Sequence, residues 1–202
     1  MNIAIVKYNA GNIYSVDYAL KRLGVEATIT SDKEMLMKAD KVIFPGVGEA
    51  ETTMNFLREQ KLDLLIKDLK QPVLGICLGM QLLFDRSTEY GDHKGLGFVS
   101  GEVVDLREDL VDKTLKVPHM GWNSLQIVKN DPIFKYFEDG EYVYYVHSFY
   151  ARNCATSTLG TSQYGNVAVT GVVRNGNVWG TQFHPEKSGD TGLRLLKAFA
   201  EL

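Results

Sequence analysis

The sequence is poor in the features that mark secreted, membrane-bound and nucleic-acid-binding proteins. It contains two cysteines, Cys77 and Cys154, whose spacing fits neither a disulfide framework nor a metal knuckle. In the cytosol such cysteines stay as thiols, which is the state we expect. No apolar run approaches the ~18 residues of a membrane span. The net charge of -3 gives no support for a basic nucleic-acid surface. We therefore expect no membrane, nucleic acid, metal or cofactor at its functional site.

The beginning of the chain, MNIAIVKYNAGN, lacks the basic leader and the small-residue cleavage site of a signal peptide. Its short apolar run predicts a first β-strand, and we expect a cytoplasmic protein. The 202 residues have ordinary globular composition and suffice for a core without disulfides or metals. Because no linker, repeat or low-complexity stretch divides the chain, we expect a single domain over residues 1–202.

The first half of the chain alternates short apolar runs with amphipathic stretches of helical period. Strands are expected at 3–6, 25–30, 41–44 and 73–76, and helices at 15–23, 50–57, 62–69 and 80–84. This order predicts an α/β fold built on an open, mostly parallel sheet with helices on both faces.

From about residue 97 the pattern changes to strand-like segments separated by turn pairs. Strands are expected at 102–106, 124–128, 142–146, 168–174 and 178–182, followed by a last helix at 192–202. Asp139-Gly140 and Asn175-Gly176 are both typical of hairpin turns. The second half is therefore expected to add antiparallel strands to the fold.

The segment Gly75-Ile76-Cys77-Leu78-Gly79 stands between a buried strand and a helix. Glycine two residues before and two after a potential nucleophile is typical of a nucleophile elbow, where neighbouring backbone leaves no room for Cβ atoms. The helix N-terminus favours a thiolate at Cys77, and the backbone N–H of Leu78 is placed to stabilise an oxyanion. The alternative is a buried cysteine that only packs in the core.

A candidate base lies in Phe183-His184-Pro185-Glu186. His184 and Glu186 are two residues apart, so in extended chain they project to the same side. A carboxylate there can fix the tautomer of the imidazole, whose other nitrogen then faces the thiol, as in a Cys-His-carboxylate triad. Taken alone, a His-x-Glu pair is more often part of a polar surface.

A second glycine-rich segment, Pro45-Gly46-Val47-Gly48, ends the third expected strand. The third glycine of a dinucleotide fingerprint is missing, and Glu49 and Glu51 would repel a pyrophosphate. A loop that turns an N–H toward developing negative charge fits better. A tight turn with no chemical role is the alternative.

Together these segments resemble the class I, triad-type glutamine amidotransferases. The resemblance rests on PGVG at 45–48, GICLGMQLLF at 75–84 and TQFHPEKS at 181–188. It implies that Cys77 attacks the side-chain amide of L-glutamine, while His184 transfers protons and Glu186 orients it. The implied oxyanion residues are Val47, Gly48 and Leu78, and the implied substrate-binding residues are Gly46, Gly79, Gln81, Glu89, His147 and Ser148. In particular, Glu89 would hold the α-amino group of the substrate.

Three further segments are similar to one branch of that family, the glutaminases of imidazole glycerol phosphate synthase. They are YNAGN at 8–12, PHMGWN at 118–123 and YVHSF at 145–149. This likeness implies a (β/α)₈-barrel cyclase partner in histidine biosynthesis, carried on a separate chain, that receives ammonia through a protected channel. The implied interface residues are Asn12, Pro118, Met120, Trp122 and Lys187. Met120 and Trp122 flank a glycine in a loop-like segment and are typical interface anchors, although burial of Trp122 in the core is the alternative.

The sequence departs from the pattern of that branch at several positions. Lys7 replaces a usual aspartate, Asn9 a usual glycine and Phe149 a common tyrosine, and Cys154 has no role that we can derive. Three alternatives remain open: a glutaminase serving another ammonia acceptor, a non-catalytic scaffold of the same fold, and a cysteine peptidase-like hydrolase that shares the elbow.

Overall fold

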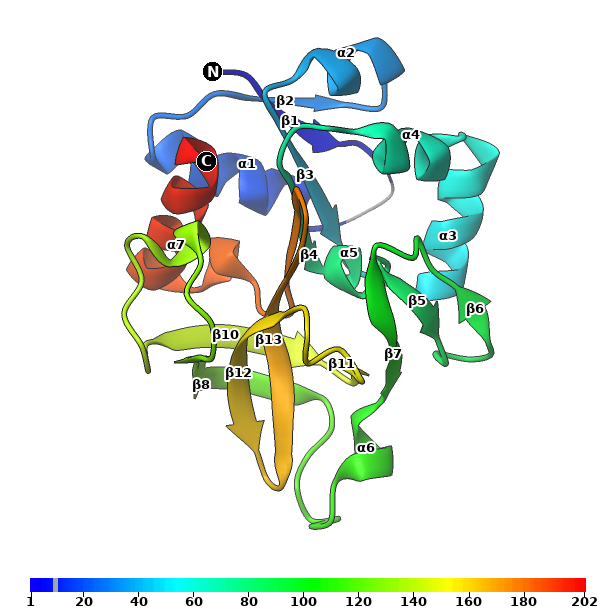
Figure 1. Cartoon of the computed structure of the whole chain (residues 1–202), viewed down its shortest axis with the longest axis vertical. Coiled ribbons are helices and arrows are strands. Elements are labelled where there is room, and N and C mark those ends of the chain that lie inside the picture. The colour runs from blue at the N-terminus through cyan, green and yellow to red at the C-terminus, as the bar shows by residue number, and fades with distance from the viewer. Residues whose placement is uncertain (9–10) are drawn as a thin grey trace.

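A computed structural model of the chain describes residues 1–8 and 11–202 (Figure 1). Its main sheet has eight strands in the order β2-β1-β3-β4-β14-β13-β12-β9. Neighbouring strands from β2 to β14 are parallel. Strands β13, β12 and β9 each run antiparallel to the strand before them in this order. The bounds are β1 Ile3–Val6, β2 Ala27–Thr30, β3 Lys41–Gly46, β4 Val73–Cys77, β9 Gln126–Ile127, β12 Thr158–Tyr164, β13 Val167–Asn175 and β14 Val178–Thr181.

Helices cover both faces of the parallel part of this sheet (Figure 1). One face carries α1 (Ile13–Arg22) and α7 (Gly189–Glu201), and the other carries α3 (Ala50–Glu59), α4 (Leu62–Asp68) and α5 (Leu78–Gln81). The short helix α2 (Lys33–Lys38) follows β2.

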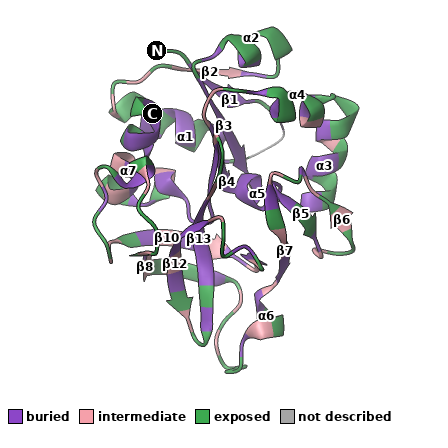
Figure 2. Ribbon diagram, viewed as in Figure 1, coloured by how far each residue is buried: buried purple, intermediate pink, exposed green. Residues whose placement is uncertain are grey.

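The central strands are buried on both sides, which explains their unbroken apolar sequences. In β1, Ile3 and Ile5 join the core under α1 and α7, whereas Ala4 and Val6 join the core under α3 and α4. This division follows from the period of two in a strand. Figure 2 shows the central strands in purple, the colour of buried residues, along the centre of the molecule.

Two smaller sheets surround the carboxyl end of the parallel strands. One has the order β11-β7-β5-β6, and the other pairs β10 with β8 in antiparallel fashion. The bounds are β5 Phe84–Ser87, β6 His93–Lys94, β7 Val99–Asp105, β8 His119–Ser124, β10 Tyr142–His147 and β11 Phe149–Arg152. Short helical turns complete the chain: α6 (Leu106–Asp109), η1 (Pro132–Phe134) and η2 (Pro185–Lys187).

The predicted α/β architecture is confirmed, including the Asn175-Gly176 hairpin between β13 and β14. The predicted helix at 80–84 is wrong, because α5 is a single turn that ends at Gln81 and Phe84 begins β5. The segment 118–123, expected to be a loop, contains most of β8. The turn at Asp139-Gly140 joins no two-residue hairpin, because β10 pairs with β8 across the long connection 125–141.

Among residues 1–8 and 11–202, no helix combines the length and the apolar character needed to cross a bilayer. Asn9, which replaces a glycine that is usual in the branch that the sequence resembles, lies outside the described residues.

Candidate active site

Cys77 lies at a sharp bend between β4 and α5. Its backbone has φ 53° and ψ -111°, a conformation that non-glycine residues adopt only under strain of about 1–3 kcal/mol. A Cβ on Gly75 would lie 2.7 Å from the carbonyl oxygen of Gly79, and a Cβ on Gly79 would lie 2.0 Å from that of Phe44. Both glycines are therefore required by close backbone packing, and the predicted nucleophile elbow is present.

His184 reaches this bend because β14 is the parallel neighbour of β4. Thr181 pairs with Ile76, so the residues that follow each strand emerge at the same edge of the sheet. The Nδ1 of His184 lies 2.8 Å from Oε1 of Glu186, and their side chains are 1% and 0% exposed. The structure thus brings together all three residues of the predicted triad.

The surroundings of His184 favour its charged form. Burial acts to lower the pKa of this imidazole, but the Cys77 thiol and the Glu186 carboxylate together outweigh burial and raise the pKa to about 10. The Nε2 atom of His184 is buried and makes no hydrogen bond of normal length to any described residue. One imidazole nitrogen is thus held by Glu186, while the other stays available beside the thiol.

Cys77 and His184 line a cavity of about 350 Å³, a size suited to a small ligand. Most of the predicted oxyanion and substrate residues line it too. They are Val47, Gly48, Leu78, Gln81, Glu89, His147 and Ser148. Gly46 and Gly79 do not line the cavity: a Cβ on Gly46 would lie 2.6 Å from the nitrogen of Gly79, so these two glycines serve the packing of the elbow. A larger cavity of about 710 Å³ lies beside β11, β12 and β13 and contains none of the triad.

Glu89 lies at one side of the cavity with its Oε2 2.7 Å from the backbone nitrogen of Ala50, from which it accepts a hydrogen bond. Burial raises the pKa of this carboxyl, and the hydrogen bond from Ala50 partly opposes that effect. A free carboxylate oxygen beside the cavity is suited to bind a cationic group such as an ammonium.

Strand β10 and the residues after it form another wall. The Nε2 of Gln81 and the Nδ1 of His147 both donate to the carbonyl oxygen of Phe149, at 2.9 Å and 2.8 Å. The backbone of Phe149 carries these contacts, so the replacement of a common tyrosine leaves them intact. The ring of Phe149 packs near Tyr90 at 6.4 Å between centroids.

Asn12 is not presented to a partner, as its predicted interface role required. It is 3% exposed, and its Nδ2 lies 3.2 Å from Oε1 of Glu186. Its amide therefore supports the triad carboxylate from behind. This contact has no local sequence signal, because α1 and η2 come from opposite ends of the chain.

The other predicted interface residues are accessible. Met120 and Trp122 are 62% and 55% exposed on the same face of β8, so Trp122 is not a core residue. Trp122 packs edge-to-face against Tyr144 at 5.9 Å. Pro118 and Lys187, both exposed, line the mouth of the cavity. The accessible apolar face of β8 thus adjoins the opening of the site.

Gln182 and His119 are two further residues of the site that were not predicted from the sequence. Gln182 is fully buried between Gln81 and Cys77, and His119 is buried against His147. A polar residue directly after the apolar strand β14 was the available signal for Gln182. Cys154 is a free thiol, as is Cys77, and packs against the hydroxyls of Thr158 and Thr170. The described residues contain no group of three or more His, Cys, Asp or Glu arranged to hold a metal ion.

Comparison with known proteins agrees with this geometry. Residues 4–201 match the family described as "Glutamine amidotransferase class-I". In solved structures, the fold is similar to PurLQS from Thermotoga maritima (TM-score 0.76, 19% identity, 99% of this chain and 97% of that chain). It is also similar to a structure titled as a glutamine amidotransferase (TM-score 0.73, 22% identity, 98% and 97%). The chain belongs to the class-I glutamine amidotransferases, which confirms the predicted family and fold.

Curated relatives narrow the comparison further. The chain is 53% identical over 202 residues to the imidazole glycerol phosphate synthase subunit HisH of Bacteroides fragilis (strain YCH46), and the match spans the whole of both. It is 48% identical over 200 residues to the subunit of the same name from Bacillus cereus (strain ATCC 14579), covering 98% of this chain and 93% of the relative. The branch predicted from the motifs is thus the branch of these relatives.

Proposed function

We propose that this protein is the glutaminase subunit of imidazole glycerol phosphate synthase and acts in histidine biosynthesis. It hydrolyses L-glutamine to glutamate and ammonia through a thioester on Cys77, and passes the ammonia to a separate (β/α)₈-barrel cyclase subunit. The observation that carries the proposal is that Cys77 and His184 line one cavity with Glu186 paired to His184, in a chain 53% identical to HisH over its full length. The whole chain acts as one domain in the cytoplasm.

The chemistry is a two-step acyl transfer. The Cys77 sulfur attacks the side-chain amide carbon of glutamine, and His184 gives a proton to the leaving nitrogen, so that ammonia departs. Water then loses a proton to His184 and attacks the thioester, which releases glutamate and the thiol. Glu186 holds the imidazole through Nδ1, so that Nε2 faces the sulfur in both steps.

The oxyanion formed in each step needs two donors. The backbone N–H of Leu78, at the start of α5, is one. The peptide at Val47 and Gly48 is the other, and Gly48, with φ 113° and open space around its Cβ position, allows this peptide to rotate. A missing donor costs on the order of 10²–10³ in rate, so rotation upon docking of the cyclase would link glutamine hydrolysis to the partner.

The exposed face of β8 is the proposed cyclase interface. Met120 and Trp122 supply apolar anchors next to Pro118 and Lys187 at the cavity mouth. Large apolar side chains on one strand face are typical of a protein–protein contact. A barrel docked over this face would cover the cavity, and ammonia would leave into the partner rather than into solvent.

The substitution Cys77→Ala tests the proposal most directly. We expect loss of glutamine hydrolysis with unchanged binding to the cyclase, because the elbow tolerates a smaller side chain that lacks the nucleophile. Ammonia release is measured with and without the cyclase and its ribonucleotide ligand. Hydrolysis that survives in the variant would discard the assignment of the nucleophile.

A further inference from the structure

Gln182 is a fully buried amide that lies between the nucleophile and the glutamine pocket, and the acyl-transfer steps above do not use it. Its Nε2 lies 3.8 Å from Sγ of Cys77, and its Oε1 accepts a hydrogen bond from Nε2 of Gln81 at 3.0 Å. The N···S distance is long but within the range of an N–H···S hydrogen bond, which exceeds that of a bond to oxygen because sulfur is larger. Burying a side-chain amide without hydrogen-bond partners would destabilise the fold. The two partners of the Gln182 amide, Gln81 and Cys77, therefore indicate its role.

The orientation of this amide is fixed by the hydrogen bonds behind it. The carbonyl oxygen of Phe149 can only accept, so the side-chain nitrogen of Gln81 must face it. That nitrogen also donates to Gln182, which must therefore present its oxygen to Gln81. The nitrogen of Gln182 is left facing the sulfur of Cys77, and a rotated amide would break the contact with Gln81.

The sulfur of Cys77 also lies near a hydrogen-bond acceptor, whereas Gln182 offers it a donor. The carbonyl oxygen of Val146 lies 4.0 Å from Sγ and can accept a hydrogen bond from a thiol, but it offers nothing to a thiolate. The N–H of Gln182 donates to the sulfur, and such a contact becomes stronger when the acceptor is charged. The two contacts therefore pull the thiol toward Val146 and the thiolate toward Gln182.

We infer that Gln182 is a positioning residue for glutamine hydrolysis, whose side-chain amide, oriented by Gln81, holds the reactive sulfur of Cys77 in place. This inference rests on the proposed function and deepens it. Gln81 is itself predicted to contact glutamine, so one shared hydrogen bond joins the substrate pocket to the nucleophile. The arrangement stabilises the sulfur in the form that attacks, without Gln182 touching the substrate.

The test compares three variants in complex with the cyclase. Gln182→Met keeps the length of the side chain without a donor, and Gln182→Glu keeps its shape but presents an oxygen to the sulfur. Gln163→Met is the matched control, because among the described residues the Gln163 side chain on β12 bonds only to the backbone of Gly165. We expect kcat to fall about 10- to 100-fold in Gln182→Met, as for one hydrogen bond to a charged group. The kcat should fall further in Gln182→Glu. In Gln182→Met, the KM for glutamine should stay within about twofold of that of the unaltered complex.

A second readout does not depend on glutamine. The rate of alkylation of Cys77 by iodoacetamide at neutral pH should fall by a similar factor in Gln182→Met, with Cys77→Ala giving the background from Cys154. A folded Gln182→Met variant with unchanged kcat and unchanged alkylation would overturn the inference. A Gln182→Glu variant with the kcat of the unaltered complex would do the same, because its carboxylate presents an oxygen to the sulfur in place of the N–H donor.

A third measurement needs no change at Gln182. In the otherwise unaltered chain, the side-chain amide resonances of Gln182 should move when Cys77 is replaced by alanine, whereas those of Gln163 should not. Unmoved Gln182 resonances would overturn the inference even if the Gln182 variants fail to fold. Absence of ammonia release by the unaltered complex would refute the proposed function instead, and the alkylation and resonance experiments would still report on the contact.

Discussion

Three histidines are buried around one cavity, yet the two sides of the cavity favour opposite charge states. On the η2 side, the carboxylate of Glu186 and the thiol of Cys77 overcome burial and raise the pKa of His184 to about 10. On the β8 and β10 side, burial lowers the pKa of His119 to about 4 and, together with His119, that of His147 to about 3. Because burial acts to lower the pKa of all three imidazoles, the neighbouring Cys77 and Glu186 decide that His184 is the one of the three that carries a proton.

The neutral pair is also fixed in its tautomers. The Nδ1 of His147 donates to the carbonyl of Phe149, so its Nε2 must accept from Nδ1 of His119, at 2.9 Å. The remaining nitrogen of His119 then accepts from the side chain of Asn123 at 3.2 Å. Every ring nitrogen of the pair is occupied, whereas His184 keeps one nitrogen open beside the nucleophile. The His184 side of the cavity can therefore take up and release protons. The side formed by His119 and His147 stays neutral and serves as a wall of the cavity.

The largest expected effect follows from exchanging the imidazole on each side in turn. His184→Asn should lower kcat about 10⁴-fold or more in the cyclase complex, because asparagine cannot take up and return the proton. His119→Asn should lower it at most about 10-fold, since an amide can still donate to His147. Steady-state ammonia release measures both variants. A comparable loss in the two would refute the division between a proton carrier and a wall.

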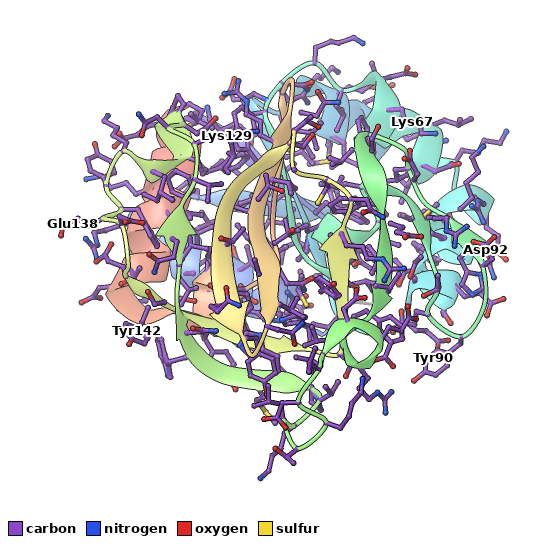
Figure 3. All side chains as sticks on the ribbon, turned by 60° about the horizontal axis from the view of Figure 1, so that its bottom comes forward. Lys67, Tyr90, Asp92, Lys129, Glu138 and Tyr142 are labelled. Carbon is purple, nitrogen blue, oxygen red and sulfur yellow. The ribbon has the colours of Figure 1, made fainter. Side chains whose placement is uncertain are left out.

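Removing the carboxylate should lower the pKa of His184 toward those of the other two histidines, although Cys77 still acts to raise it. In Glu186→Gln we expect kcat to fall about 10²–10⁴-fold, because the amide does not stabilise the imidazolium. The pKa of His184 should also fall, which NMR titration of the imidazole measures. Glu138→Gln is the control, since Glu138 is exposed on the surface (Figure 3) and does not line the cavity. An unchanged pKa of His184 would show that Glu186 does not set its charge.

The smallest expected effect is on stability in mild acid. His119 and His147 stay neutral in the folded protein well below pH 6.5, where histidines of the unfolded chain take up protons, so the free energy of unfolding falls as pH decreases. Each should contribute a loss on the order of 1–2 kcal/mol between pH 7 and 5. His184 adds little there, because its raised pKa gives stability that is lost only as pH rises from 6.5 toward 10.

Urea unfolding at pH 7 and pH 5 measures this loss. His119→Asn should show a smaller difference between the two pH values than the unaltered chain, because one of the two histidines no longer titrates. An identical difference would mean that the pair does not remain neutral in the folded protein.

The sequence was most informative where the chain is locally constrained. The elbow could be predicted because glycines at 75 and 79 are demanded by backbone packing, and His184 and Glu186 because two residues of extended chain bring them together. The contact of Asn12 with Glu186 could not be predicted, since it depends on how α1 meets η2. The strand β8 was predicted to be a loop, because Met120 and Trp122 stand on either side of Gly121 in a pattern that resembles one. Likewise, no local pattern places Gln182 beside a sulfur from another strand.

The position of β14 in the main sheet also affects when activity can appear. This strand enters between β4 and β13, so a central place in the sheet is filled by a segment that is synthesised well after its parallel neighbour β4. Until then, the growing chain carries a cysteine without its imidazole and releases no ammonia. Catalytic competence therefore requires synthesis to pass His184, and a polypeptide that stops before this residue consumes no glutamine.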